Sequence, residues 1–134
     1  MKIFAITTLV INLAIQSLGA PYAYTHTGPN SFDCSGLAYY CYLEGAGIEL
    51  PRTAYEQGYC EEYQKIENIE DLRLGDLVFF DTLRDNDKSD HTGIYLGNRR
   101  FIHASYSQKR VIISTIDNNY FEGCFSWGRR IITD

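Results

Sequence analysis

Concentrated positive charge is missing from this sequence. No run of Lys or Arg is longer than a pair, as at Arg99-Arg100 and Arg129-Arg130. In total, 17 Asp and Glu residues outnumber 12 Lys and Arg residues, which gives a net charge of −5. Proteins that bind nucleic acids or anionic membrane surfaces gather Lys and Arg into patches. The sequence therefore argues against a dedicated nucleic-acid binder and offers no basic segment for a membrane surface.

The cysteines lack the spacing of a metal site. The four cysteines, at positions 34, 41, 60 and 124, form no Cys-x-x-Cys pair and no Cys/His ligand pattern. Structural zinc sites are built from such closely spaced ligands, so we expect no zinc. An even number of cysteines permits two disulfides, but the sequence around Cys34 indicates a working thiol, and the redox compartment stays open.

No internal repeat and no linker-like segment divides the chain. Its 134 residues, 45% of them hydrophobic, suffice for one hydrophobic core. We therefore expect a single domain spanning residues 1–134.

The apolar stretch at residues 3–15 has two interpretations. With Met1 and Lys2 before it, it is typical of a secretory signal peptide, and it is too short for a membrane span. Alternatively it is the first helix of the domain, because apolar residues recur at positions 6, 10, 14 and 18. We favour the helix, since the polar residues at positions 7, 8, 12 and 16 would be poor in a signal core.

Helix-like segments precede strand-like segments along the chain. The pattern predicts helices at 37–44 and 50–57, an acidic irregular surface at 58–71, and strands at 77–80, 91–96, 101–106, 111–116 and 124–132. Short connectors of the kind found between the middle strands make antiparallel hairpins. Helices followed by a meander indicate the α+β class.

Cys34 is the candidate nucleophile. Asp33 is a good N-cap residue for the helix that follows, and Gly45 stands where that helix is expected to stop. Cys34 would then lie at the positive end of a helix, which lowers the pKa of a thiol and favours the nucleophilic thiolate.

Two histidines are candidate partners for this thiol. His91 begins a strand after a polar loop and His103 lies on the next strand, so hairpin pairing would bring the two rings close together. One imidazole could accept the thiol proton while the other fixes its tautomer. His26, on a loop eight residues before Cys34, is the alternative base, although catalysis needs rigid positioning.

Acyl transfer also needs hydrogen-bond donors for an oxyanion. The backbone N–H of Cys34 and the hydroxyl of Tyr22 are the candidates. Arg52 follows Pro51 at a predicted helix start. It is either a surface residue or a clamp for a substrate carboxylate, which its planar guanidinium suits.

Six short sequence blocks occur in the order that is characteristic of one family. They are LGAPYAY from residue 18, TGPNSFDCSGL from 27, LPRTA from 50, LGDLVFF from 74, HTGIYLG from 91 and FIHA from 101. Together they resemble the NlpC-type cysteine peptidases, the NlpC and p-sixty group, and the resemblance runs from about residue 6 to 132. Where that family usually has Gly-Gly, this chain has Thr25-His26. We expect the loop to differ there, since Thr is strained at positive φ.

This resemblance implies a papain-like α+β fold, with N-terminal helices packed on a C-terminal antiparallel β-meander. It implies a cysteine endopeptidase that hydrolyses peptidoglycan stem peptides, usually between γ-linked D-glutamate and a diamino acid, through a Cys thiolate, a His base and an acyl-enzyme. It implies no metal and no cofactor. Carried over by position, the implied roles are nucleophile for Cys34, base for His91, orientation of that base for His103, oxyanion binding for Tyr22 and Cys34, and substrate binding for Asp33, Ser35 and Arg52.

Two other functions stay open at this point. One is a related thiol amidase or acyltransferase that acts on another amide or ester. The other is a binding module without activity, against which the presence of Cys34, His91 and His103 argues. We expect a monomer that is secreted or otherwise delivered to the cell wall and binds muropeptides, without a membrane span or a separate wall-binding domain.

Overall fold

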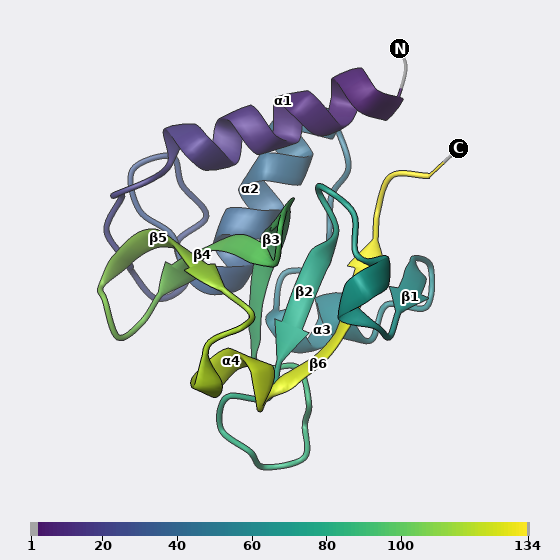
Figure 1. Ribbon diagram of the computed structural model, residues 1–134. Coiled ribbons are helices and arrows are strands. Elements are labelled where there is room, and N and C mark those ends of the chain that lie inside the picture. Colours follow the sequence, from purple (N-terminus) through teal and green to yellow (C-terminus); the bar gives the residue numbers. More distant parts are fainter. Residues whose placement is uncertain (1–2, 134) are drawn as a thin grey trace.

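The computed structural model describes residues 3–133, in which helices cover a six-stranded antiparallel sheet (Figure 1). Met1 and Lys2, which belong to the signal-peptide interpretation, lie outside the described residues. In chain order the elements are α1 (Ile3–Gln16), α2 (Cys34–Ala46), α3 (Ala54–Gly58), β1 (Gln64–Ile66), the 3-10 helix η1 (Ile69–Asp71), β2 (Leu77–Phe80), β3 (His91–Gly97), β4 (Arg100–Ser105), β5 (Arg110–Thr115), α4 (Asn119–Glu122) and β6 (Phe125–Arg130).

The strands follow the order β1-β6-β2-β3-β4-β5, and every neighbouring pair is antiparallel. The run from β2 to β5 is the predicted meander, while β6 returns to pair with the free side of β2. In this register Phe80 of β2 pairs with His91 of β3, and His103 of β4 pairs with Ile112 of β5. The predicted α+β, papain-like arrangement is confirmed.

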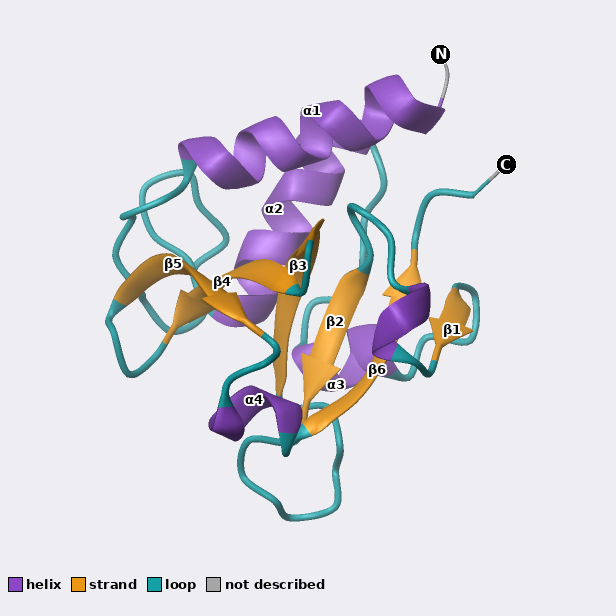
Figure 2. Ribbon diagram, viewed as in Figure 1, coloured by secondary structure: helices purple, strands orange, loops and turns teal. Residues whose placement is uncertain are grey.

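β2 divides the core because its side chains alternate between the two faces of the sheet. All four are buried, and Leu77 and Phe79 join the cluster beneath α1 and α2, whereas Val78 and Phe80 join a second cluster on the opposite face. That second cluster is covered by η1 and α4 (Figure 2). A strand that is buried on both faces has a continuous run of apolar residues in its sequence. The run LVFF therefore predicted β2.

α1 lies across the end of α2 (Figure 1), with Val10 and Ala14 fully buried between them. These two residues belong to the predicted apolar stripe, so residues 3–16 form a helix of the folded domain. None of the helices between residues 3 and 133 combines the length and apolar character needed to cross a bilayer.

Gly45 does not end α2, contrary to the sequence expectation. The helix continues to Ala46, and Gly47 ends it with φ of 68°. Gly45 instead allows close helix packing, because a Cβ there would lie 3.0 Å from the backbone of Val10.

Several elements differ from the sequence prediction. α3 begins at Ala54, because Thr53 caps it by accepting a hydrogen bond from the Glu56 N–H. β1 lies within the segment 58–71 that was expected to be irregular, where it pairs with β6. α4 was not predicted, and the last strand covers only Phe125–Arg130 of the predicted 124–132. Elements of three to five residues carry too little periodicity to be recognised.

Candidate active site

Cys34 is the first residue of α2 and lines a cavity of about 480 Å³. As predicted, Asp33 caps this helix, since its Oδ1 accepts from the Gly36 N–H at 2.6 Å. Gly36 is needed at this place because a Cβ would lie 2.1 Å from the carbonyl oxygen of His26. The cap and the close loop together fix the position of the thiol.

The loop before α2 carries a strained residue. Thr25 has φ of 70°, a conformation that a β-branched residue rarely adopts. Our expectation that Thr25 would avoid positive φ is therefore wrong. Its N–H donates to Asp33 Oδ2 at 2.9 Å, and this bond holds the loop against the start of α2.

His91 and His103 meet as predicted. Nε2 of His91 lies 2.8 Å from Nδ1 of His103, and Nε2 of His103 lies 2.8 Å from Oγ of Ser114 on β5. If each ring donates along this chain, His91 Nε2 carries a proton and His91 Nδ1 keeps a free lone pair. The second histidine thus prepares the first one to act as a base.

Burial keeps both histidines uncharged. It lowers the pKa of His91 to about 4, although the nearby Asp90 carboxylate raises it. It lowers the pKa of His103 to about 2, and the proximity of His91 adds to this effect. The rings pack among aromatic side chains, with Phe121 5.5 Å from His103 and Phe80 6.2 Å from His91 between ring centres. A charged imidazole is disfavoured in such surroundings.

Burial also raises the pKa of the Cys34 thiol to about 11. The backbone N–H groups of Thr92 and Ser35 hydrogen-bond the sulfur and lower the pKa, but they do not offset the burial. The expected lowering of the thiol pKa at the helix start is therefore wrong, since desolvation by burial is the largest effect on this thiol. Thr92 directly follows His91, so its effect on the thiol pKa indicates that the sulfur lies near the beginning of β3.

Tyr22 lines the same cavity as Cys34. Burial raises the pKa of its phenol to about 12, and the nearby Cys34 thiol adds to the increase. The hydroxyl therefore stays protonated and can donate a hydrogen bond to a developing oxyanion.

Asp33, Ser35 and Arg52 form one polar group at the wall of this cavity. The Arg52 guanidinium donates to Asp33 Oδ2 and to Ser35 Oγ, both at 2.8 Å. The Arg52 side chain is about a third exposed, so it remains partly accessible from the solvent. The structure thus brings together the three residues that the sequence assigned to substrate binding.

The backbone carbonyl of His26 accepts from the Asp33 N–H at 2.9 Å, but His26 does not line the cavity of Cys34. Its exposed ring bonds Ser31 through Nδ1 at 2.6 Å, so a role as base is not supported by its position. The four cysteines are unpaired, and Cys41 is a buried core residue as expected.

Sequence reasoning missed two groups of the site, Ser114 and the Thr92 N–H. Alternation along β5 places Ser114 on the same face as Ile112, but only the β4–β5 register puts that face beside His103. The sequence carries no signal for this register.

Comparisons with known proteins agree on one family. The family model for NlpC/P60 matches residues 19–130. The chain is 35% identical over 133 residues to murein DD-endopeptidase MepH of Escherichia coli, covering 98% of this chain and 48% of that protein. It is 38% identical over 122 residues to the gamma-DL-glutamyl hydrolase of Bacillus subtilis, covering 90% of this chain and 28% of that protein.

A solved structure, NlpC2 from Trichomonas vaginalis, superposes with a TM-score of 0.85 at 33% identity. The match covers 97% of this chain and 48% of that chain. The present chain thus spans half or less of the length of these similar proteins.

Proposed function

The chain belongs to the NlpC/P60 family, and from this premise we propose that it is a cysteine peptidase that hydrolyses the stem peptides of bacterial peptidoglycan. The observation that carries the proposal is the chain of contacts from His91 through His103 to Ser114, next to the cavity that Cys34 lines together with Asp90, the residue before His91. A nucleophile, a base and a group that orients the base are the parts that acyl transfer through a thiol requires.

The reaction begins with an uncharged pair. As the Cys34 sulfur attacks the amide carbon, its proton moves to Nδ1 of His91, and the Tyr22 hydroxyl and the Cys34 N–H donate to the carbonyl oxygen. The C–N bond then breaks, His91 returns the proton to the leaving nitrogen, and a thioester to Cys34 remains. Water, deprotonated by His91, hydrolyses the thioester and restores the thiol.

The proposed bond joins γ-linked D-glutamate to a diamino acid. The name of the gamma-DL-glutamyl hydrolase supports a γ-glutamyl acyl group. The paired Asp33 and Arg52 side chains, with Ser35, form the charged wall along which the N-terminal end of the stem peptide would lie. We further propose that the protein acts as a monomer at the cell wall.

A second candidate is hydrolysis of the cross-link between stem peptides, which the name murein DD-endopeptidase MepH favours. It would use the same thiol and histidines on a different acyl group. A thiol amidase or acyltransferase remains the third possibility.

Incubation with soluble muropeptides followed by mass spectrometry separates these functions. The wild type should cut after D-glutamate, and Cys34→Ala should lose activity by about a thousandfold or more. Cys60→Ala is the matched control, because Cys60 lies outside the cavity of Cys34, and it should keep full activity.

If cross-linked stem peptides are separated and the bond after D-glutamate stays intact, hydrolysis of the cross-link would replace hydrolysis at D-glutamate as the proposed function. A folded protein that cuts no stem peptide would contradict both peptidase functions.

A further inference from the structure

One buried hydroxyl group near the site has no hydrogen-bond partner. Thr92, the residue after His91 on β3, is fully buried, and its Oγ1 bonds no other group in the part of the chain that the structure describes. A buried hydroxyl without a partner costs folding free energy, and a valine of the same shape would avoid that cost. The stability of the fold therefore does not explain why a threonine stands at this position.

The side chain of Thr92 points toward α2. Thr92 pairs with Phe79 of β2, and residues directly opposite each other on neighbouring strands lie on the same face of a sheet. Phe79, and Ile94 two residues further along β3, belong to the cluster beneath α1 and α2. α2 packs on β3, and the Thr92 N–H lowers the pKa of the thiol of Cys34, the first residue of α2. The unpaired hydroxyl therefore lies on the side of β3 that faces the start of α2.

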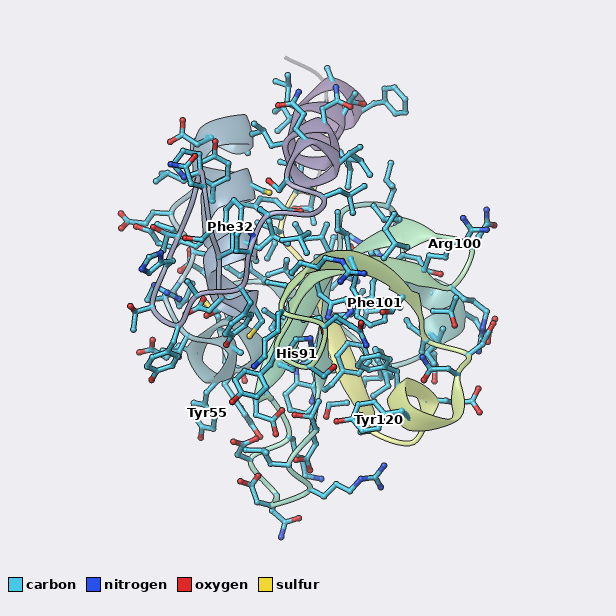
Figure 3. The ribbon with its side chains drawn as sticks, turned by 90° about the vertical axis from the view of Figure 1, so that its left-hand side faces the viewer. Phe32, Tyr55, His91, Arg100, Phe101 and Tyr120 are labelled. Carbon is cyan, nitrogen blue, oxygen red and sulfur yellow. The ribbon has the colours of Figure 1, made fainter. Side chains whose placement is uncertain are left out.

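The beginning of β3 also lies beside the cavity of the nucleophile. Ser89 and Asp90, which lead into β3, line this cavity together with Cys34. Figure 3 shows His91, the first residue of β3, on the same side of the molecule as Tyr55, which lines the cavity too. Thr92 is thus the first fully buried residue of the strand that leads away from the cavity.

Gln57 also contains a buried atom without a partner. Its Nε2 donates to the carbonyl oxygens of Ser35, at 3.2 Å, and of Pro51, at 2.9 Å, while its Oε1 is unpaired. An amide oxygen can accept from a hydroxyl. Both Gln57 Oε1 and Thr92 Oγ1 nevertheless lack a partner among the described residues, so they do not bond each other. No acceptor between residues 3 and 133 therefore takes the proton of the Thr92 hydroxyl.

The Cys34 sulfur becomes an acceptor during the reaction. A neutral thiol accepts hydrogen bonds weakly, whereas a negatively charged sulfur accepts them strongly. Charge develops on the sulfur when its proton moves to His91, and again when the thioester breaks and the sulfur leaves. We infer that the Thr92 hydroxyl donates a hydrogen bond to the Cys34 sulfur at these two steps, keeping its own proton throughout, and is a further catalytic group of the site. The inference rests on the proposed function, in which Cys34 is the nucleophile.

A donor of this kind acts on kcat. It bonds the charged sulfur and leaves the neutral thiol unpaired, so it stabilises the transition state more than the bound substrate. Burial raises the pKa of the Cys34 thiol to about 11, which means that the charged sulfur gains little from solvent and benefits from a nearby donor. The hydroxyl that has no partner in the free protein is then explained by a hydrogen bond that forms only as the thiol reacts.

Thr92→Val in the full chain removes the hydroxyl and keeps the shape of the side chain. Alkylation of Cys34 by iodoacetamide at pH 8, followed by mass spectrometry of the Cys34 peptide, requires the charged sulfur and no substrate. We expect this alkylation to be about tenfold slower, and kcat on muropeptides to fall by about tenfold with KM unchanged. The midpoint of thermal unfolding should stay the same or rise by about 2–5 °C, because no buried hydroxyl is left unpaired.

Two further variants serve as controls. Thr92→Ser keeps the hydroxyl and loses the methyl group, so it should restore both rates to within about threefold of the wild type although the smaller side chain lowers stability. Thr115→Val makes the same replacement as the test variant at an exposed position of β5, and it should change neither rate. A purely structural role of Thr92 would not make the more stable variant the slower one.

Unchanged alkylation and an unchanged kcat in Thr92→Val would overturn the inference. A Thr92→Val protein that unfolds at a lower temperature than the wild type would also overturn it, because the hydroxyl would then stabilise the fold. Neither result would affect the proposed peptidase function. If the wild type cleaves no muropeptide, the proposed function fails, and the alkylation rates alone then decide whether Thr92 donates to the charged sulfur.

Discussion

At the scale of single residues, the hydrogen bond made by one nitrogen of His91 determines what the other nitrogen can do. His91 Nε2 is engaged by His103, and His103 is engaged in turn by Ser114. Each partner lies on a different strand, so the pairing of three antiparallel neighbours brings these groups together. The same burial that orders these rings also keeps them uncharged.

Ser114→Ala tests the outer end of this chain. Loss of the hydroxyl leaves His103 Nε2 without its partner, so we expect kcat to fall by about three- to tenfold with little change in KM, because Ser114 acts through His103 and touches no substrate. Thr115→Ala, the exposed neighbour on β5, is the matched control for steady-state kinetics. An equal loss of kcat in both variants would show that the loss comes from a disturbance of β5 and not from the missing Ser114 hydroxyl.

The two histidines also predict how stability depends on pH. Burial lowers the pKa of His91 from 6.5 to about 4 and that of His103 to about 2. Below pH 6.5 the unfolded chain therefore binds protons that the folded chain does not. The free energy of unfolding should fall as pH falls from 6.5 to 4, by up to about 1.4 kcal/mol per pH unit for each histidine.

Urea unfolding between pH 4 and pH 7 measures this slope. His103→Asn removes one of the two groups and should make the slope smaller. A slope that is unchanged in this variant would show that other groups cause the acid sensitivity.

At the scale of elements, the contact between α1 and α2 makes the first helix part of the domain. Gly45 faces the backbone of Val10, and this close approach lets the two helices bury Val10 and Ala14. A glycine costs helix stability inside α2, so its presence there is explained by packing and not by a turn.

Gly45→Ala tests this explanation. A Cβ at 3.0 Å from the Val10 backbone cannot be accommodated by rotating a side chain, so α1 must shift. We expect a loss of about 1–3 kcal/mol in thermal or urea unfolding, in spite of the better helix propensity of alanine. Glu44→Ala, at the exposed preceding position, should change stability by less than about 0.5 kcal/mol. Stabilisation by Gly45→Ala would contradict the packing argument.

At the scale of the whole molecule, one buried ion pair joins the last strand to the turn before β2. The Arg130 guanidinium donates to both oxygens of the Asp76 carboxylate, at 2.9 and 2.8 Å, and Asp76 is only 2% exposed. The Arg73 N–H donates to the same carboxylate at 2.8 Å. This pair fixes the beginning of β2, at the opposite end of that strand from Phe80, which pairs with His91.

Arg130→Met should therefore cost about 3–5 kcal/mol of unfolding free energy, because it leaves Asp76 buried without its cation. Arg99→Met, which breaks surface pairs with Glu70 and Asp117, should cost less than about 1 kcal/mol. Similar losses in the two variants would show that the burial of Asp76 does not determine the cost.

Local sequence patterns determined several features of the fold and of the site. The cap at Asp33, the thiol at the start of a helix, the apolar run of β2 and the order of the meander all follow from contacts between residues near in the chain. The blocks around Cys34, His91 and His103 were sufficient for the family and the fold class.

Only the tertiary structure decided the properties that depend on burial and register. Ser114 meets His103 through strand pairing, Gly45 meets Val10 through helix packing, and the thiol pKa rises because residues far apart in the chain partly bury Cys34. The cavity of Cys34 arises in the same way, from loops and helices that the sequence does not place next to each other. The desolvation of a side chain and the register between two strands depend on residues that are distant in the sequence. No local sequence pattern therefore encodes them.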